Sequence, residues 1–165
     1  MPADSPIKEF ISNSPEETIA LGKQIAHAVA AAHFFDVNKC FTGCVIALQG
    51  TLGSGKTYLT KGIAAGFGIT ENLTSPTYTI INEYAIPITS NNKQELKFFH
   101  IDVYRLDGEK DFEDIGGIDI LNSKGVIVIE WSERISNSLP SDIIRISIYT
   151  SGTSRSIRIT GLDNI

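Results

Sequence analysis

Residues 50–57 read Gly50-Thr51-Leu52-Gly53-Ser54-Gly55-Lys56-Thr57, which is the pattern G-x-x-x-x-G-K-[ST] of a phosphate-binding P-loop. Its glycines let the backbone curl so that successive N–H groups point at a phosphate chain. A helix that begins near Lys56 adds the positive end of its dipole. We expect Lys56 to reach the β- and γ-phosphates and the Thr57 hydroxyl to ligate magnesium. The run predicts a site for a nucleoside triphosphate.

The residues on both sides of this run give it the context that a P-loop needs. The apolar segment 44–48 comes directly before it and is typical of a strand buried on both faces, as in a parallel sheet. Residues 56–66 after it have the composition of a helix. A strand, a glycine-rich turn and a helix in this order favour a true phosphate loop over a chance match.

The rest of the chain alternates between apolar runs and helical segments. Further buried strands are expected at 78–86, 96–101 and 126–129, with a helix around 109–115, and loops at 36–43 and 90–95. Residues 143–149 and 156–160 are expected to close the sheet as an antiparallel pair at its edge. Strands that alternate with helices predict a three-layer α/β domain of the P-loop NTPase type, with a mostly parallel sheet flanked by helices.

The start of the first helix carries its own signal. Ser14, Pro15 and Glu17 form a capping box with proline at the first helical position. Apolar residues then recur at helical spacing, which predicts a helix over 15–34. Together with the absence of any repeat or linker, this indicates a single domain over 1–165, with an N-terminal arm at 1–13 and a core at 14–160.

Length and composition limit the function classes. The chain has 165 residues, 42% of them hydrophobic, which is enough to bury the core of one domain. The longest apolar stretch, 28–35, is too short to span a membrane, and the first residues lack the pattern of a secretion signal. A formal charge of −5 argues against a broad grip on nucleic acid, so we expect no DNA partner. Cys40 and Cys44 are expected to be reduced thiols in a cytoplasmic protein.

Two carboxylates follow apolar runs, at the positions where a P-loop protein holds its metal. Asp102 ends the run 98–101, and Glu130 ends the run 126–129. In an open parallel sheet both lie along the crevice where ligands bind. One is expected to coordinate magnesium and the other to orient the attacking water, and their spacing does not assign the two roles.

Several residues near these carboxylates could belong to the site or to the scaffold. Trp131, the only tryptophan, follows Glu130 and could cap the core or border the ligand. His100 shares the strand face of Asp102 and is more often a structural histidine than a catalyst. The turn Ser75-Pro76-Thr77 follows the P-loop helix, where nucleotide-binding proteins often keep a segment that senses the γ-phosphate.

A nucleoside triphosphate site is compatible with an ATPase and with three alternative functions. A GTPase needs an N-K-x-D guanine motif, which the sequence 92–95 only approximates, and D-x-x-G at 114–117 falls in a helical region. A small-molecule kinase normally has an arginine-rich lid, and the five arginines here are scattered. The third alternative is a binding module that docks to a partner according to whether ATP is bound and hydrolyses little ATP itself. This alternative shares most of its features with a weak ATPase.

Taken together, the motifs resemble one family. The chain is similar to the TsaE (YjeE) family, the small bacterial ATPases that help to make N6-threonylcarbamoyladenosine in tRNA. The resemblance runs from about residue 14 to residue 158, in the same order and spacing. It is carried by the helix start at 14–18, the P-loop, Ser-Pro-Thr-Tyr-Thr at 75–79, His-Ile-Asp-Val-Tyr-Arg-Leu at 100–106, Ile-Glu-Trp at 129–131 and Leu-Pro at 139–140.

The resemblance implies an ATPase that uses ATP and Mg²⁺, is weak alone, and acts with TsaD and TsaB homologues, with tRNA held through that complex. It implies that Lys56 holds phosphate, that Thr57 and Glu130 serve magnesium, and that Asp102 takes the other carboxylate role. The nucleotide-binding residues that it implies are Pro15, Thr18, Leu52, Gly53, Ser54, Gly55, Lys56, Thr57, Trp131 and Arg155, with Pro15, Thr18 and Arg155 bordering the adenine. Thr51 and Tyr58 depart from the family pattern, which usually has an acidic residue and a second Thr or Ser there.

Overall fold

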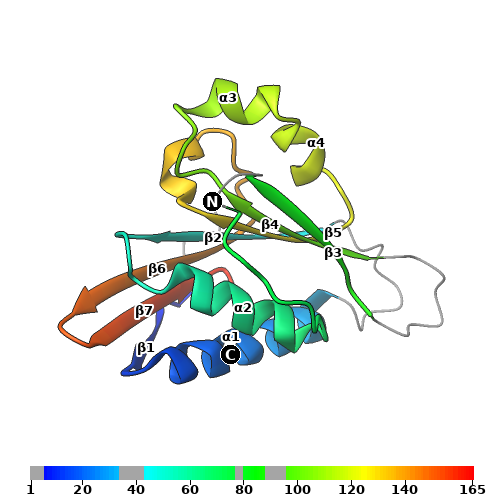
Figure 1. Cartoon of the computed structure of the whole chain (residues 1–165). Coiled ribbons are helices and arrows are strands. Elements are labelled where there is room, and N and C mark those ends of the chain that lie inside the picture. The colour runs from blue at the N-terminus through cyan, green and yellow to red at the C-terminus, as the bar shows by residue number, and fades with distance from the viewer. Residues whose placement is uncertain (1–5, 34–42, 77–79, 88–95) are drawn as a thin grey trace.

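A seven-stranded sheet forms the centre of the molecule, in the order β1-β7-β6-β2-β5-β4-β3 (Figure 1). The computed structural model describes residues 6–33, 43–76, 80–87 and 96–165. The strands are β1 (Lys8–Ser12), β2 (Cys44–Gly50), β3 (Ile81–Ala85), β4 (Lys97–Asp102), β5 (Gly125–Glu130), β6 (Ile144–Ser151) and β7 (Ser154–Thr160). The helices are α1 (Pro15–His33), α2 (Lys56–Gly66), α3 (Glu109–Asp114), α4 (Gly117–Leu121) and the 3₁₀ helix η1 (Ser132–Ile135).

The middle of the sheet is parallel and its two sides are antiparallel. Strand β2 pairs in parallel with both β5 and β6, and β5 pairs in parallel with β4. On one side β7 and then β1 add antiparallel strands, and on the other side β3 runs antiparallel to β4. This confirms the predicted α/β class, with a parallel core and antiparallel strands at the edge.

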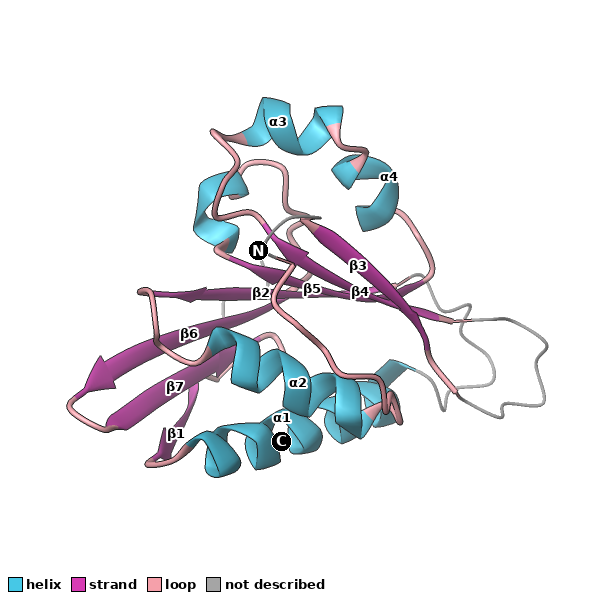
Figure 2. Cartoon of the chain, in the orientation of Figure 1, coloured by secondary structure: helices cyan, strands magenta, loops and turns pink. Residues whose placement is uncertain are grey.

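Helices cover both faces of the sheet (Figures 1 and 2). Helices α1 and α2 pack on one face over an apolar cluster that includes Leu21, Ile25 and Ile63. On the other face α3, α4 and η1 pack over a second cluster that includes Phe112 and Ile135. Strands β2 and β5 lie between the two clusters, which explains why their sequences are continuous apolar runs.

The predicted capping box at the start of α1 is present. The Glu17 backbone N–H donates to Ser14 Oγ at 3.1 Å, and the Asn13 backbone N–H donates to Glu17 Oε2 at 2.6 Å. The first bond satisfies an N–H group in the first turn of α1, where no helical partner exists, whereas the second joins Glu17 to the residue before the cap rather than to the Ser14 N–H. They fix the point at which the chain leaves β1 and enters α1.

The prediction of a strand buried on both faces at 78–86 is wrong. The observed strand β3 covers Ile81–Ala85, is only half-buried, and runs antiparallel to β4 at the end of the sheet. Glu83 and Ala85 are exposed while Ile81, Asn82 and Tyr84 are half-buried, and β3 is the last strand of the sheet among the described residues. Residues 77–79 lie outside the described part of the chain.

The N-terminal side of the sheet also differs from the prediction. Residues 8–12, predicted as part of an arm outside the core, form strand β1 and pair with β7. The pair β6 and β7 is therefore not at the edge, because β1 occupies it. A five-residue strand with the sequence Lys-Glu-Phe-Ile-Ser has little strand signal of its own, and it forms because β7 offers a row of unpaired backbone groups.

Two further expectations fall partly outside the described residues. Most of the loop predicted at 36–43, the loop at 90–95 and Cys40 lie there. Cys44 is buried in the core, and burial raises the pKa of its thiol to about 12. Within the described ranges, no helix has both the length and the apolar character needed to cross a membrane.

Candidate functional site

The P-loop connects the end of β2 to the start of α2, as the sequence predicts. Its glycines have the backbone conformations that the motif requires: φ is +149° at Gly50 and +105° at Gly55. A Cβ atom at Gly50 would lie 2.7 Å from the Ile148 carbonyl oxygen, and one at Gly55 would lie 2.9 Å from Arg155 Nε. The backbone contact at Gly50 and the positive φ at both positions disfavour any larger residue.

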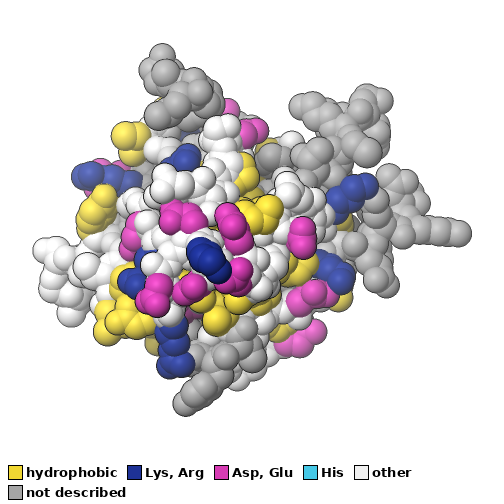
Figure 3. Space-filling model, turned by 90° about the horizontal axis from the view of Figure 1, so that it is seen from above, with side chains coloured by type: hydrophobic (Ala, Val, Ile, Leu, Met, Phe, Trp, Pro, Cys, Tyr) yellow, Lys and Arg dark blue, Asp and Glu magenta, His cyan; other side chains and the backbone are white. Residues whose placement is uncertain are grey.

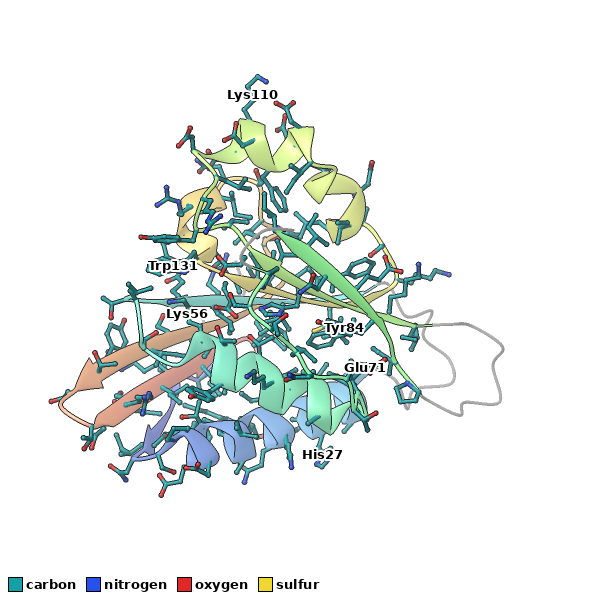
Figure 4. The ribbon with its side chains drawn as sticks, viewed as in Figure 1. His27, Lys56, Glu71, Tyr84, Lys110 and Trp131 are labelled. Atoms are coloured by element: carbon teal, nitrogen blue, oxygen red, sulfur yellow. The ribbon has the colours of Figure 1, made fainter. Side chains whose placement is uncertain are left out.

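Lys56 lies at the mouth of the loop with only 4% of its surface exposed. Its Nζ donates to the Gly50 carbonyl at 2.7 Å and to the Thr51 carbonyl at 3.0 Å. The same ammonium group lies 3.8 Å from the centroid of the Trp131 ring, and Figure 4 shows the two side chains facing each other. Burial lowers the pKa of Lys56, while the charges of nearby carboxylates oppose that shift.

Thr57 and Glu130 join the P-loop helix to the end of β5. Thr57 Oγ1 donates to Glu130 Oε2 at 3.1 Å, although 73 positions separate the two residues. A hydroxyl group has one hydrogen and two lone pairs, so Thr57 can keep this bond and still offer a lone pair to a cation. Glu130 itself is 2% exposed.

The other carboxylate oxygen of Glu130, Oε1, contacts two buried side chains. His100 Nε2 lies 2.7 Å from Glu130 Oε1, and Thr60 Oγ1 lies 3.4 Å from the same oxygen. Sequence reasoning identified neither contact. Thr60 lies one helical turn after Lys56 and Thr57, and His100 lies on the strand next to Glu130, so helical spacing and strand alternation were the available signals.

Asp102 ends β4 directly opposite Glu130, so the two predicted carboxylates do lie side by side. Asp102 Oδ2 accepts a hydrogen bond from Ser75 Oγ at 3.2 Å, and Oδ1 accepts one from the Tyr104 backbone N–H at 2.9 Å. Ser75 belongs to the predicted switch-like turn, whose Thr77 lies outside the described residues. The structure thus brings the first part of that turn to the site.

Trp131 stands at the rim, between the carboxylates and the surface. Its backbone has φ of +63°, which is uncommon for a bulky residue and indicates local strain. Its ring packs against Tyr104 with the centroids 4.7 Å apart, and the Arg134 guanidinium lies 5.8 Å from the Tyr104 ring centroid. The tryptophan therefore contacts the site through Lys56 and the surface through Tyr104.

These groups line a cavity of about 210 Å³. Its walls are Leu52, Gly53, Ser54, Gly55, Lys56, Thr57, Tyr58, Ser75, Asp102, Glu130 and Trp131. All three residues predicted for magnesium and seven of the predicted nucleotide-binding residues are in this set. A second hollow of about 440 Å³ lies beyond Trp131, between the P-loop and the β6 residues 147–150.

Three predicted nucleotide-binding residues lie outside the cavity wall. Arg155 is close to it, because its Nε donates to the Ser54 carbonyl at 2.9 Å. Thr18 is fully buried and its hydroxyl contacts Ser12 Oγ at 2.8 Å. Pro15 lies at the half-exposed start of α1. Their assignment to the adenine rim stays a prediction.

The site differs from that of a GTPase at the residues that can be checked. Asp114 ends α3, and Gly116 separates α3 from α4 with φ of +80°, so D-x-x-G at 114–117 joins two helices and does not directly follow a strand. The approximate guanine motif at 92–95 lies outside the described residues.

Comparisons with known proteins agree with one another. The profile of the family described as "Threonylcarbamoyl adenosine biosynthesis protein TsaE" matches residues 12–157. A relative from Bacillus subtilis (strain 168), named tRNA threonylcarbamoyladenosine biosynthesis protein TsaE, is 39% identical over 152 residues, covering 92% of this chain and 84% of the relative. A relative of the same name from Treponema pallidum (strain Nichols) is 43% identical over 106 residues, covering 64% and 73%. The crystal structure of Bacillus subtilis YdiB superposes with a TM-score of 0.66 at 32% identity, covering 98% of this chain and 89% of that one.

Proposed function

This chain belongs to the TsaE family, and we propose that it binds ATP with Mg²⁺ and hydrolyses the nucleotide to drive threonylcarbamoyladenosine modification of tRNA. The observation that carries the proposal is the Thr57–Glu130 hydrogen bond at the mouth of the P-loop. It joins the hydroxyl that would ligate the cation to a buried carboxylate, beside Lys56 in the wall of the cavity.

The donor set suits magnesium bound together with a nucleotide. Among the described residues, no three His, Cys, Asp or Glu side chains gather closely enough to hold a metal ion. Mg²⁺ usually binds through one or two carboxylates plus substrate phosphates. Thr57 and Glu130 supply such a partial site next to the phosphate loop, and the nucleotide would complete it.

The chain's own residues suggest how hydrolysis would proceed. Lys56 would leave the carbonyls of Gly50 and Thr51 and bind the phosphates, because an anion is a stronger partner for an ammonium group than two carbonyl oxygens. Asp102, held by Ser75 and the Tyr104 backbone, would orient the water that attacks the γ-phosphorus. The products are ADP and inorganic phosphate.

We further propose that TsaD and TsaB homologues are the partners, in the cytoplasm, and that tRNA is held mainly through them. Charge supports this division of work. Residues 107–119 hold six carboxylates and one lysine. The formal net charge of this segment is therefore −5, the same as that of the whole chain. Figure 3 shows that acidic side chains gather on this face of the molecule, around α3. Such a face repels the phosphate backbone of RNA.

The test is phosphate release from ATP in the steady state, with and without the cognate TsaD–TsaB complex. We expect turnover near background for the chain alone and a clear rise with the complex. The Lys56→Ala variant, added to the same complex, is the control for a contaminating ATPase. Nucleotide binding without any stimulation would favour the binding-module alternative, and no binding at all would contradict the proposal.

A further inference from the structure

His100 is a buried histidine whose one polar contact among the described residues is with a residue of the proposed site. It lies in the middle of β4, opposite Val128 on β5, and none of its surface is exposed. Glu130 is two residues further along β5, at the diagonal position on the same face of the sheet. That placement brings His100 Nε2 to 2.7 Å from Glu130 Oε1.

The second ring nitrogen of His100 has no such partner. Nδ1 is buried and makes no hydrogen bond to any described residue. A carboxylate only accepts hydrogen bonds, so a proton is assigned to Nε2, which donates to Glu130. A buried nitrogen without a partner destabilises the fold relative to an apolar side chain of similar size. Packing alone therefore does not account for a histidine at this position.

Thr60 is a second buried polar residue that contacts Glu130, and it comes from α2 instead of from the sheet. It is fully buried on α2, and its hydroxyl lies 3.0 Å from the Lys56 carbonyl and 3.4 Å from the same Glu130 Oε1. The one hydrogen of this hydroxyl is shared between these two acceptors and lies nearer the Lys56 carbonyl, so both buried groups contact Glu130 Oε1, His100 by the stronger bond and Thr60 by the weaker one. The other oxygen, Oε2, is left to Thr57 at the cavity.

We propose that His100 and Thr60 are positioning residues that fix the Glu130 carboxylate by Oε1, so that Oε2 is presented to the cation beside Thr57. This inference rests on the proposed function, because it assumes that the site binds Mg²⁺ with a nucleotide. Groups that hold a ligating side chain in this way commonly change metal affinity about 10- to 100-fold when they are removed.

The test measures the gain in nucleotide affinity that magnesium provides, without relying on turnover. Calorimetry gives the affinity for a non-hydrolysable ATP analogue in excess Mg²⁺ and again in EDTA, and the ratio of the two is the magnesium gain. For His100→Leu, which keeps the volume and removes the donor, we expect the gain to fall about tenfold or more. The affinity in EDTA should stay at the wild-type value.

Four further variants separate positioning from simple packing. His100→Gln places an amide N–H near the position of Nε2 and should restore much of the gain. Thr60→Val should lower the gain less than His100→Leu, because its contact is longer, while Thr60→Ser should keep it. Ser132→Ala, which removes a fully buried hydroxyl that contacts the Leu48 carbonyl and not Glu130, is the matched control.

The outcomes are distinct. A wild-type magnesium gain in both His100→Leu and Thr60→Val would overturn the inference, and so would a folded His100→Gln that behaves like His100→Leu. If His100→Leu does not fold, Thr60→Val against Thr60→Ser decides the question. A wild-type protein that shows no magnesium gain would instead contradict the proposed function.

Discussion

Asp102 and Glu130 lie directly opposite each other, as the last residues of the parallel neighbours β4 and β5. Their carboxylates nevertheless contact different parts of the molecule. Glu130 is bound to Thr57 and Thr60 of α2, whereas Asp102 is bound to Ser75 and to the Tyr104 backbone. The two adjacent groups are therefore suited to separate tasks.

Changing each carboxylate to its amide should produce different defects. Glu130→Gln should weaken nucleotide binding in magnesium and leave binding in EDTA unchanged, because the cation contact is lost. Asp102→Asn should keep both affinities and lower turnover in the presence of the partner complex by about 100-fold or more, as expected when a group that handles the attacking water is removed. Calorimetry and phosphate release measure the two effects, and identical defects would contradict the division of roles.

Removing the loop lysine should weaken ATP binding. Lys56→Ala eliminates charge-assisted hydrogen bonds to phosphate, which corresponds to a loss of affinity of about 10- to 100-fold. Lys61→Ala removes the same charge from the same helix, at a residue whose ammonium lies over the Tyr58 ring, and should change affinity little. An unchanged affinity of Lys56→Ala in calorimetry would rule out the P-loop assignment.

Nucleotide affinity should fall in alkaline solution. Burial holds the pKa of Lys56 below its ordinary value of 10.5, so the free protein begins to lose this proton below that pH. Bound phosphates favour the charged form and raise the pKa again, so binding takes up protons in that pH range. Calorimetry in buffers of different ionisation enthalpy detects the uptake. The guanidinium of the Lys56→Arg variant stays protonated throughout this pH range. The nucleotide affinity of that variant should therefore not depend on pH in this way.

Trp131 should report nucleotide binding by fluorescence. It is the only tryptophan, and in the free protein the Lys56 ammonium lies against its ring. When Lys56 turns to phosphate, the environment of the indole changes, so ATP should shift the emission of the wild-type protein. The shift should be absent in Lys56→Ala and should persist in Tyr104→Leu, which alters only the outer side of the ring. A wild-type emission that does not respond to saturating ATP would contradict this movement.

The contact between α1 and α2 should be intolerant of a single methyl group. A Cβ atom at Gly62 would lie 2.2 Å from the Ile19 carbonyl oxygen, and both helix backbones would have to separate. Gly62→Ala should therefore lower the free energy of unfolding by about 1–3 kcal/mol, the usual effect of overpacking. Ala65→Gly, at an exposed position of the same helix, should lower it by about 1 kcal/mol through helix propensity alone. Denaturant unfolding compares the two, and an unaffected Gly62→Ala would show that the helices can move apart easily.

Local sequence patterns predicted the features that depend on near neighbours. The P-loop, the bounds of α2 and the capping box at Ser14 follow from residue types at fixed short spacings, and each is present in the structure. The strand at 78–86 was predicted to be buried on both faces, whereas β3 is a half-buried strand at the end of the sheet, because an apolar run looks alike whether one or two strands will flank it. Strand β1 was missed because its stability comes from pairing with β7, almost the whole length of the chain away.

The sequence by itself determined that this chain has a phosphate loop and two carboxylates at strand ends, because these depend on glycine, lysine and strand-end positions that can be read directly. Only the tertiary structure decided how the carboxylates are used. The contacts of Glu130 with Thr57, Thr60 and His100 span 30 to 73 positions, and they exist because parallel pairing of β4 with β5 and packing of α2 on the sheet fix the register between distant segments. Spacing along the chain places Thr60 and His100 on the correct faces of their helix and strand, but it does not bring them to Glu130.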